Sequence, residues 1–385
     1  FHRPRLERDG VVICGAYGRG NAGDDAILDA ILQEVRSLDP DMPVTVLSKD
    51  PAATRLTYRV RSIHRSHVLS WRHAMRKSVL YINGGGSLIQ DVTSRRSLWY
   101  YLYNIRSAHA LGCRVQMYGC GIGPVTRDKH RRMAARTLND CVDIITLREP
   151  DSQAELQAMG VTKPRILLTA DPALTLSAAT EDETDSVLLR AGIPPHGRYL
   201  CFALRRWPGF EEAAPAIRAA AAYAYETYGL TPVFLSVEKH LDPGAGRVAA
   251  NGLTVPHYFL DDAGKAGTII GALSRMEAVV SMRLHALIFA AGQGIPLVGI
   301  VYDPKVSAFL RYIGQEQFED LSALTEESLR RMIDRAVEQS HDRAAQAARM
   351  PEYADGGTAE LVGYMYDHLD EFRLLLDASY GTRFH

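Results

Sequence analysis

Arg283 and His285 stand two positions apart at the predicted start of a helix, just after a predicted strand that ends at Ser281. A helix N-terminus offers backbone N–H donors and the positive end of a dipole, and a guanidinium group matches the fork of a carboxylate or a phosphate. A histidine can deliver a proton near neutral pH. The segment therefore predicts an anion site with a proton donor beside it. The alternative for His285 is a packing or capping role.

A glycine-rich segment follows the first predicted strand, with Gly18, Gly20 and Gly23 at the spacing of a dinucleotide-binding loop. Asp24 and Asp25 come next and disfavour a pyrophosphate there, because they add negative charge where a phosphate needs bare N–H groups. We expect instead that this loop binds a polyhydroxylated ligand, because carboxylates and amides bind hydroxyl groups. A plain turn with an aspartate cap is the alternative.

Two further glycine-rich segments, 83–91 and 119–124, also follow predicted strands. Glycines allow the backbone to approach a ligand closely. Because the carboxyl ends of parallel strands meet at one edge of a sheet, the three segments together predict a broad ligand-binding floor.

The elements that must position these segments alternate along the chain. Short β-branched runs are separated by longer stretches of helical periodicity, which is typical of parallel sheets with crossover helices. The pattern predicts an α/β fold of two doubly wound, Rossmann-like domains with a ligand in an interdomain cleft. The predicted strands span 11–15, 44–48, 79–82, 115–118, 142–146, 166–168, 199–204, 232–237, 278–281 and 296–301.

A polar stretch at 177–186 interrupts the alternation and is the predicted linker. It separates an N-terminal domain, 1–180, from a C-terminal domain, 187–350. Helical patterns follow from 325 to about 349 and, in a C-terminal helix, within 358–385. We expect this last helix to pack back on the N-terminal domain.

The charges of the 385 residues nearly cancel, with a formal net charge of −1, which excludes a general polyanion binder. The local balance differs, because residues 51–90 contain seven arginines and lysines and no acidic residue. Basic and aromatic residues continue at 95–103. This mixture favours contact with an anionic membrane surface or a phosphorylated lipid. Single-stranded nucleic acid and a plain solvated face are the alternatives.

The five cysteines include no C-x-x-C pair, and four lie in or beside apolar runs, which predicts reduced thiols in a cytoplasmic protein. The charged first ten residues do not resemble a secretory signal. The longest apolar stretch, 284–301, is interrupted by His285, Gln293 and Pro296, so no membrane span is expected. We therefore expect a cytoplasmic protein with peripheral contact at the inner face of the membrane.

The combined motifs resemble those of the CsaB-like polysaccharide pyruvyl transferases over about residues 11–309. They comprise G-x-G-N-x-G-D at 18–24, N-G-G-G-S at 83–87, T-L-R-E at 146–149, D-P-A at 171–173, S-M-R-L-H at 281–285 and Y-D-P-K at 302–305. The resemblance implies a GT-B-like arrangement of the two domains. It also implies phosphoenolpyruvate as donor and no metal or other cofactor.

The family pattern implies the residues on the donor side, and the glycine-rich segments themselves indicate those on the acceptor side. The phosphoenolpyruvate-binding residues are expected to be Arg148, Arg283, Leu284, His285 and Lys305, and the catalytic residues His285 and Asp24. The acceptor-binding residues are expected to be Tyr17, Asn21, Asp24, Gly85, Ser87 and Asp91. The aspartate following Asp24, where the family pattern leads us to expect glutamate, weakens the assignment on the acceptor side.

The implied reaction moves a pyruvyl group from phosphoenolpyruvate to a sugar as a 4,6-ketal and releases phosphate. The implied acceptor is N-acetylmannosamine of a lipid-linked cell-wall polysaccharide precursor, whose ketal anchors surface-layer proteins. A GT-B glycosyltransferase that uses a nucleotide sugar is the chief alternative, and a sugar-phosphate or lipid-phosphate binding module is another. No nucleic-acid partner is expected, and the sequence leaves the oligomeric state open.

Overall fold

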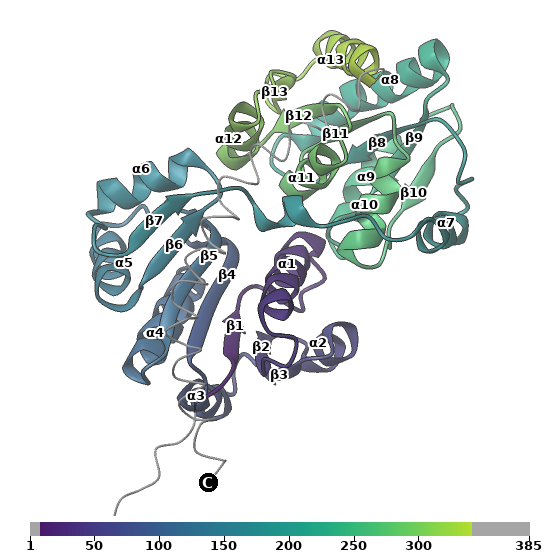
Figure 1. The fold of residues 1–385 in the computed structure, drawn as a ribbon. Helices are drawn as coiled ribbons and strands as arrows, with labels where there is room; N and C mark the ends of the chain where they lie inside the picture. The colour runs from purple at the N-terminus through teal and green to yellow at the C-terminus, as the bar shows by residue number, and fades with distance from the viewer. Residues whose placement is uncertain (1–7, 341–385) are drawn as a thin grey trace, which may run out of the picture. The chain divides into compact units, whose positions relative to one another are not determined.

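The computed structural model describes residues 8–340, which form two compact units, each built around a parallel β-sheet with helices on both faces (Figure 1). In the described part of the chain, the first unit comprises residues 8–16 and Gln33–Asp171. The second unit comprises Tyr17–Leu32 and the residues from Pro172 onward. The first unit is therefore interrupted by a segment that belongs to the second.

Seven strands from the described residues form the sheet of the first unit, in the order β3-β2-β1-β4-β5-β6-β7, and all of them pair in parallel. They are β1 (Val11–Cys14), β2 (Val44–Ser48), β3 (Arg61–His64), β4 (Leu80–Ile89), β5 (Arg114–Ile122), β6 (Ile144–Leu147) and β7 (Arg165–Leu168). The chain reverses its direction of travel between β1 and β4. In open α/β sheets, ligands bind outside the carboxyl ends of strands at such a reversal.

Crossover helices cover this sheet. They are α2 (Pro51–Tyr58), α3 (Val68–Lys77), α4 (Arg95–Ala110), α5 (Asp128–Cys141) and α6 (Pro150–Met159). Right-handed crossovers place helices on opposite faces when the chain moves in opposite directions along the sheet. The path from β2 to β3 runs one way and the path from β3 to β4 runs the other, so α2 covers one face and α3 the opposite face, together with α4 (Figure 1).

Six strands from the described residues form the sheet of the second unit, in the order β10-β9-β8-β11-β12-β13, again all parallel. They are β8 (Tyr199–Ala203), β9 (Thr231–Leu235), β10 (Tyr258–Leu260), β11 (Ala278–Ser281), β12 (Leu297–Val301) and β13 (Phe318–Asp320). The reversal here lies between β8 and β11. The carboxyl ends of β9, β8, β11 and β12 are therefore neighbours.

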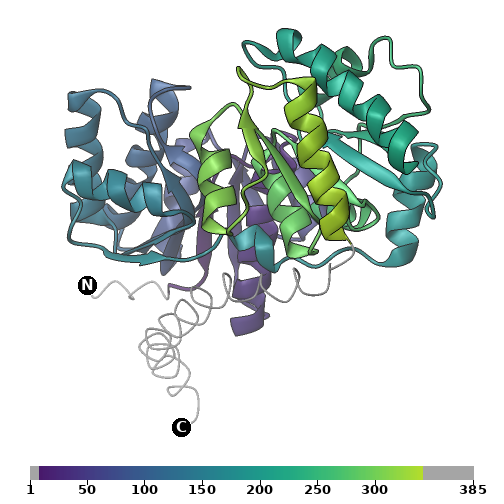
Figure 2. The same cartoon turned by 90° about the horizontal axis from the view of Figure 1, so that it is seen from above.

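The helices of the second unit are α7 (Glu181–Arg190), α8 (Phe210–Tyr228), α9 (Asp242–Ala250), α10 (Ala266–Ser274), α11 (Leu284–Gly292), α12 (Pro304–Tyr312) and α13 (Glu326–Gln339), with a 3-10 helix at Pro172–Thr175. Two apolar clusters fill the two faces of the sheet. α13, the yellow-green helix of Figure 2, packs against α8 on one face. Ala26 and Ala30 join the cluster on the other face, and both come from α1 (Ala22–Leu38).

The predicted α/β architecture with parallel sheets is confirmed, and a strand occurs at each predicted position. β3, β10 and β13 were not predicted. All three are short and lie at sheet edges. An edge strand pairs with only one neighbour, so a weaker apolar pattern is sufficient for it.

The glycine segments at 83–91 and 119–124 differ from the prediction of loops after strands. β4 continues through Gly84, Gly85 and Gly86, and β5 continues to Ile122. Their parallel pairing persists through Gly84 with Tyr118 and then shifts register after Gly86. Gly85 and Gly86 have φ values of 56° and 74°, a conformation that favours glycine, so these residues shape an irregular strand end.

The division of the chain also differs from the predicted linker at 177–186. The units separate between Asp171 and Pro172, and α7 begins at Glu181 within the predicted linker, capped by the side chain of Thr180. The acidic residues read as a linker are the first turn of that helix, where negative charge is favourable. The predicted helix within 358–385, and the predicted helical residues from 341 to 349, lie outside the described residues.

Within residues 8–340, none of the helices combines the length and the apolar character that crossing a bilayer would require.

Candidate active site

Arg283 lies between two carboxylates in the second unit. Its Nη2 donates to Oε2 of Glu238 at 2.7 Å, and its Nε lies 3.1 Å from Oδ2 of Asp242. Arg283 is only 6% exposed, and the Asp242 side chain is fully buried. Burial alone would lower the pKa of Arg283, but the charges of Asp242 and Glu238 raise it above its ordinary value. The guanidinium is therefore held firmly in its charged form.

The start of α11 places Arg283 at this position. Arg283 is the N-cap residue, and no side chain caps the helix in the described part of the chain. Its backbone N–H donates to Oγ of Ser281 at 2.8 Å, which fixes the turn out of β11. The first turn of α11 therefore presents the positive end of its dipole next to a guanidinium, as an anion site requires.

The glycine loop before α1 is bound to the segment that follows β9. The backbone of Asn21 forms an antiparallel bridge with Glu238, Ala22 N–H donates to the carbonyl of Val237 at 3.1 Å, and Lys239 N–H donates to Gly20 at 3.3 Å. Glu238 thus contacts the loop through its backbone and Arg283 through its side chain. The loop residues Tyr17, Asn21 and Asp24 therefore belong to the same unit as Arg283 and His285.

His285 is the second residue of α11, and its ring lies against Gly23 in the first turn of α1. A Cβ on Gly23 would lie 2.0 Å from Nδ1 of His285, so only glycine leaves room for the ring. Asn21 helps to hold this turn, because its Oδ1 accepts from the N–H of Gly23 at 3.0 Å. The proton-transfer candidate and the glycine loop are thus in direct contact.

Two aspartates, Asp24 and Asp25, lie in the first turn of α1. Asp24 is half-buried. Burial raises the pKa of Asp25 to about 6, although the N–H of Gly18 and the charge of Lys239 act in the opposite direction. A carboxyl group with a pKa of about 6 can exchange a proton near neutral pH. Asp25 was not among the predicted site residues.

Leu284 and Lys305 have different surroundings. The Leu284 side chain is 6% exposed and packs in the apolar cluster of the second unit, so only its backbone could contact a ligand. Lys305 begins α12 after β12, and its Nζ lies 3.3 Å from Oδ2 of Asp303. Because β12 is next to β11, Lys305 follows the strand adjacent to the one that precedes Arg283.

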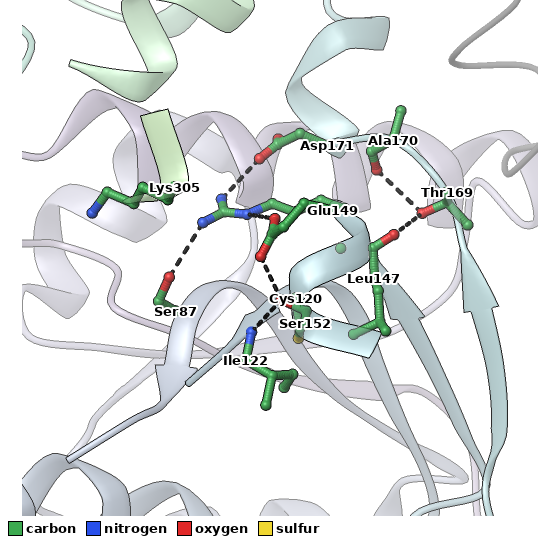
Figure 3. A network of polar contacts seen from close by, with 12 residues as sticks. Ser87, Cys120, Ile122, Leu147, Glu149, Ser152, Thr169, Ala170, Asp171 and Lys305 are labelled. Carbon is green, nitrogen blue, oxygen red and sulfur yellow. Dashed lines mark hydrogen bonds and ion pairs between the residues drawn. The ribbon is translucent and has the colours of Figure 1, made fainter. Parts of the chain in front are cut away.

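Arg148 is buried in the first unit, where it forms a second polar cluster with Ser87, Glu149 and Asp171, all three of which are labelled in Figure 3. Its Nη1 donates to Asp171 at 2.9 Å, its Nε to Glu149 at 3.0 Å and its Nη2 to Oγ of Ser87 at 3.3 Å. Burial disfavours the charged guanidinium, but the charges of Glu149 and Asp171 raise the pKa of Arg148 above its ordinary value. Glu149 is held in turn by the hydroxyl of Ser152.

The strand ends of the first unit surround this cluster. A Cβ on Gly121 would lie 3.0 Å from both Ser87 Oγ and Glu149 Oε1, so β5 passes close to the cluster. Gly85 contributes backbone to the same region of β4. Asp91, two residues after the end of β4, has a fully buried side chain, and its Oδ2 lies 2.7 Å from Nδ1 of His130.

The Asp91 carboxylate accepts hydrogen bonds from the N–H groups of Thr126 and Arg127 and from the Thr126 hydroxyl. These donors occupy the oxygens that a sugar would need. The geometry gives Asp91 the task of holding the 124–127 turn in place.

The predicted site residues therefore fall into two groups. Tyr17, Asn21, Asp24, Arg283, Leu284, His285 and Lys305 belong to the second unit, and Gly85, Ser87, Asp91 and Arg148 belong to the first. Glu238 and Asp242 were missed. Their positions could have indicated a role in the site. The segment from Glu238 to Asp242 is rich in charge and follows a predicted strand, as Arg283 does.

The cations among the predicted site residues are paired with carboxylates. Arg148 contacts two carboxylates, Arg283 contacts two, and Lys305 contacts one. An incoming anion would have to compete with these carboxylates for the cations. In the described part of the chain, no three His, Cys, Asp or Glu side chains are grouped as a metal ion would need.

Several solved structures resemble this fold over nearly the whole chain. HepE of Anabaena, solved with UDP-glucose, aligns with a TM-score of 0.62 and 10% identity over 94% of this chain and 99% of that chain. The UDP-GlcNAc 2-epimerase of Methanocaldococcus jannaschii aligns with a TM-score of 0.64 and 10% identity over 93% and 99%. A glycosyltransferase of Rickettsia africae gives 0.61 and 9% over 96% and 99%.

At these identities the alignments show a shared GT-B-like fold and nothing about the ligand. No curated protein sequence matches the chain. The family model of the polysaccharide pyruvyl transferases matches residues 21–304, from the glycine loop through Arg283 and His285 to the residue before Lys305. The chain therefore belongs to the polysaccharide pyruvyl transferase family.

Proposed function

We propose that this protein transfers the pyruvyl group of phosphoenolpyruvate to two hydroxyl groups of a sugar in a cell-wall glycan precursor, forming a 4,6-ketal and releasing phosphate. The observation that carries the proposal is the contact between His285 and Gly23. It joins a proton-transfer candidate beside a buried arginine to the loop that we expect to bind the acceptor.

Arg283 and the start of α11 suit the donor. Phosphoenolpyruvate carries a carboxylate and a phosphate, and a guanidinium binds either group through two hydrogen bonds. Nη2 and Nε of Arg283 point to Glu238 and Asp242. Binding of the donor would therefore exchange a protein carboxylate for a substrate anion, or would use the remaining Nη1 together with N–H groups of α11 and Nζ of Lys305.

The chemistry assigned to His285 is protonation of the donor. A proton added to the methylene carbon of phosphoenolpyruvate leaves an oxocarbenium-like centre at C2, and a sugar hydroxyl attacks that carbon and loses its own proton. The second hydroxyl then forms the second C–O bond, the bond from C2 to the phosphate oxygen breaks, and the second hydroxyl proton leaves with phosphate. One acid and one base are needed. Asp24 is the proposed base.

On the acceptor side we propose Tyr17, Asn21 and Asp24, because their loop also holds the residue against which His285 packs. Arg148, Gly85, Ser87 and Asp91 were also expected at the site, but they belong to the first unit. We base the proposal on the second unit alone. Asp91 would act there only by positioning its neighbours, because its carboxylate is buried.

The finer parts of the proposal concern the acceptor. N-acetylmannosamine on a lipid carrier is the acceptor that the family pattern favours, and such a substrate would bring the protein to an anionic membrane surface on the cytoplasmic side. A ketal-bearing glycan of this kind would anchor surface-layer proteins. The transfer needs no metal under this proposal, because arginine, lysine and a helix terminus compensate the charge of the donor.

The test is turnover. The full chain is incubated with phosphoenolpyruvate and lipid-linked disaccharides, with phosphate release and the pyruvyl mass gain as readouts, after exhaustive chelation of metals. His285→Gln should keep most of the donor affinity and lower turnover by about a hundredfold. His196→Gln, an exposed histidine of the same unit, is the matched control. In heavy water, the pyruvyl methyl group should acquire solvent deuterium.

The chief alternative has its own readout. Nucleotide sugars bind several proteins with this fold, so calorimetric titration with UDP-sugars is run beside phosphoenolpyruvate. Tight binding of a UDP-sugar without turnover of phosphoenolpyruvate would replace the proposal with a glycosyltransferase. Near-normal turnover in His285→Gln would instead leave the reaction in place and assign the proton to another group.

A further inference from the structure

We propose that the first unit docks on an anionic lipid bilayer through one surface formed by α3 and α4. We call it the α3–α4 face, and its defining residues are Leu69, Arg72, Arg76, Arg96, Trp99 and Tyr103. This docking surface rests on the proposed function, because a lipid-linked acceptor would lie at a membrane. The α3–α4 face is the surface that would bring the enzyme to that acceptor.

The two helices form one continuous surface. Trp71 of α3 is buried and meets Tyr103 of α4 edge to face, with ring centroids 5.9 Å apart. Nη1 of Arg72 donates to Oγ of Ser107 at 3.2 Å. Both helices lie on the same side of the sheet, opposite to α2 (Figure 1). The outward residues of α3 and α4 can therefore face one partner together.

The charge of this surface has one sign. The sequences of α3 and α4 contain no aspartate or glutamate, and each helix contributes three arginines or lysines. Arg76, Lys77, Arg95, Arg96 and Arg106 are exposed. The whole chain carries a net charge of only −1, so this attraction to anions is a local property of the surface. Basic groups near an anionic bilayer each strengthen binding, and salt weakens the effect.

Large apolar side chains are exposed among these charges. Leu69 is 85% exposed, Trp99 51% and Tyr103 49%. Aromatic rings with a polar edge are favoured at the headgroup level of a bilayer, and a leucine gains free energy from the acyl boundary below it. Nucleic acid would stack on the rings but would offer little to an aliphatic side chain. The combination of Leu69 with the basic residues therefore favours a lipid surface.

The first experiment is cosedimentation of the full chain with vesicles. Vesicles of phosphatidylcholine alone are compared with vesicles of phosphatidylcholine and phosphatidylglycerol, at low and high salt. We expect binding to the anionic vesicles only, and we expect salt to weaken it. Equal binding to both compositions, or none to either, would overturn the proposal.

Variants locate the surface. Leu69→Ser, Arg76→Gln and Trp99→Ser should each lower the vesicle partition coefficient about fivefold or more. Leu56→Ser is the matched control, because Leu56 is also 85% exposed but lies on α2, on the opposite face of the sheet. An equal loss in Leu56→Ser would refute the assignment to the α3–α4 face. Unchanged circular dichroism and melting temperature ensure that folding is intact.

The triple variant Leu69→Ser/Arg76→Gln/Trp99→Ser separates this proposal from the proposed function. It should lose vesicle binding yet turn over phosphoenolpyruvate with a water-soluble acceptor at the wild-type rate. Vesicle binding without any turnover would refute the proposed function and leave the docking surface in place. Competition by single-stranded oligonucleotides, or a mass change of the triple variant in sedimentation without vesicles, would assign the face to nucleic acid or to a second copy of the chain and overturn the proposal.

Discussion

The ring of His285 occupies the space that a side chain on residue 23 would need, since a Cβ on Gly23 would lie 2.0 Å from Nδ1. Gly23 belongs to α1 and His285 to α11. Glu238 links the two segments, because its backbone forms a bridge with Asn21 and its side chain accepts a hydrogen bond from Arg283 at the start of α11. In the sequence, Gly23 matches the third glycine of a dinucleotide-binding loop. In the structure, its missing side chain leaves room for the imidazole ring of His285.

Gly23→Ala should consequently displace His285. We expect turnover to fall by at least tenfold, while donor affinity changes much less, because Arg283 keeps its own contacts. Steady-state kinetics and calorimetry measure the two effects. Gly244→Ala is the control, because a Cβ there has its nearest neighbour at 3.6 Å, an ordinary contact distance. Normal turnover in Gly23→Ala would mean that the position of His285 does not matter to the reaction.

Glu238→Gln should increase the affinity for phosphoenolpyruvate. Glutamine keeps the shape and the backbone bridge, but it removes one negative charge that competes with the substrate for Arg283. The gain should be on the order of tenfold at low salt, and salt should reduce it. Glu211→Gln, in the exposed pair with Arg206, controls for a general charge effect. Weaker binding would indicate that Glu238 chiefly holds Arg283 in its place.

Arg148→Ala should destabilise the protein by about 3–5 kcal/mol, because it leaves two buried carboxylates without their cation. Adding Asp171→Asn to that variant should restore part of the loss. Arg114→Ala is the control, since that pair with Asp143 is largely exposed and its loss should cost about 1 kcal/mol or less. Urea denaturation measures all three. A small loss for Arg148→Ala would show that its surroundings are open to water.

Asp91 should make stability depend on pH in the acid range. Burial would raise its pKa, but hydrogen bonds from Thr126, His130 and Arg127 lower it to about 2. The native state therefore binds fewer protons than the unfolded state between about pH 4 and pH 2, and stability falls as the pH falls through that window. Asp91→Asn should lower stability by about 2 kcal/mol at pH 7 and by almost nothing near pH 2.

Denaturation curves at several pH values check this prediction. Asp140→Asn, an exposed aspartate of the same unit, should leave the pH profile unchanged. A constant difference between wild type and Asp91→Asn at every pH would show that packing, and not charge, explains the effect.

Much of the fold was predictable because parallel strands buried on both faces leave strong apolar runs. β2 and β11 occur with the predicted bounds, and most other boundaries differ by one or two residues. The main errors arose where the local pattern and the tertiary pairing disagree. In β4, three consecutive glycines indicate a loop, but pairing with β5 continues through them. In α7, a run of acidic residues indicates a linker but begins a helix.

The site was predictable only in part. Arg283 and His285 lie two positions apart and follow a strong strand pattern, so the local sequence was sufficient to place both at the start of a helix. Glu238 could not be linked to Arg283 in the same way, because that pairing depends on β9 and β11 lying on either side of β8. The glycine loop likewise belongs to the second unit because of its hydrogen bonds to residues 237–239. The local sequence of the loop does not indicate these long-range hydrogen bonds.

The bridge between Asn21 and Glu238 also bears on how the chain folds as it is synthesised. Residues 17–32 leave the ribosome before the rest of the second unit, yet Ala26 and Ala30 complete an apolar cluster whose other buried members lie between Ala173 and Ile313. Until those residues are made, Ala26 and Ala30 lack the apolar neighbours that bury them in the folded protein. Contacts so distant in sequence also slow folding, so refolding of the whole chain should depend on this late docking step.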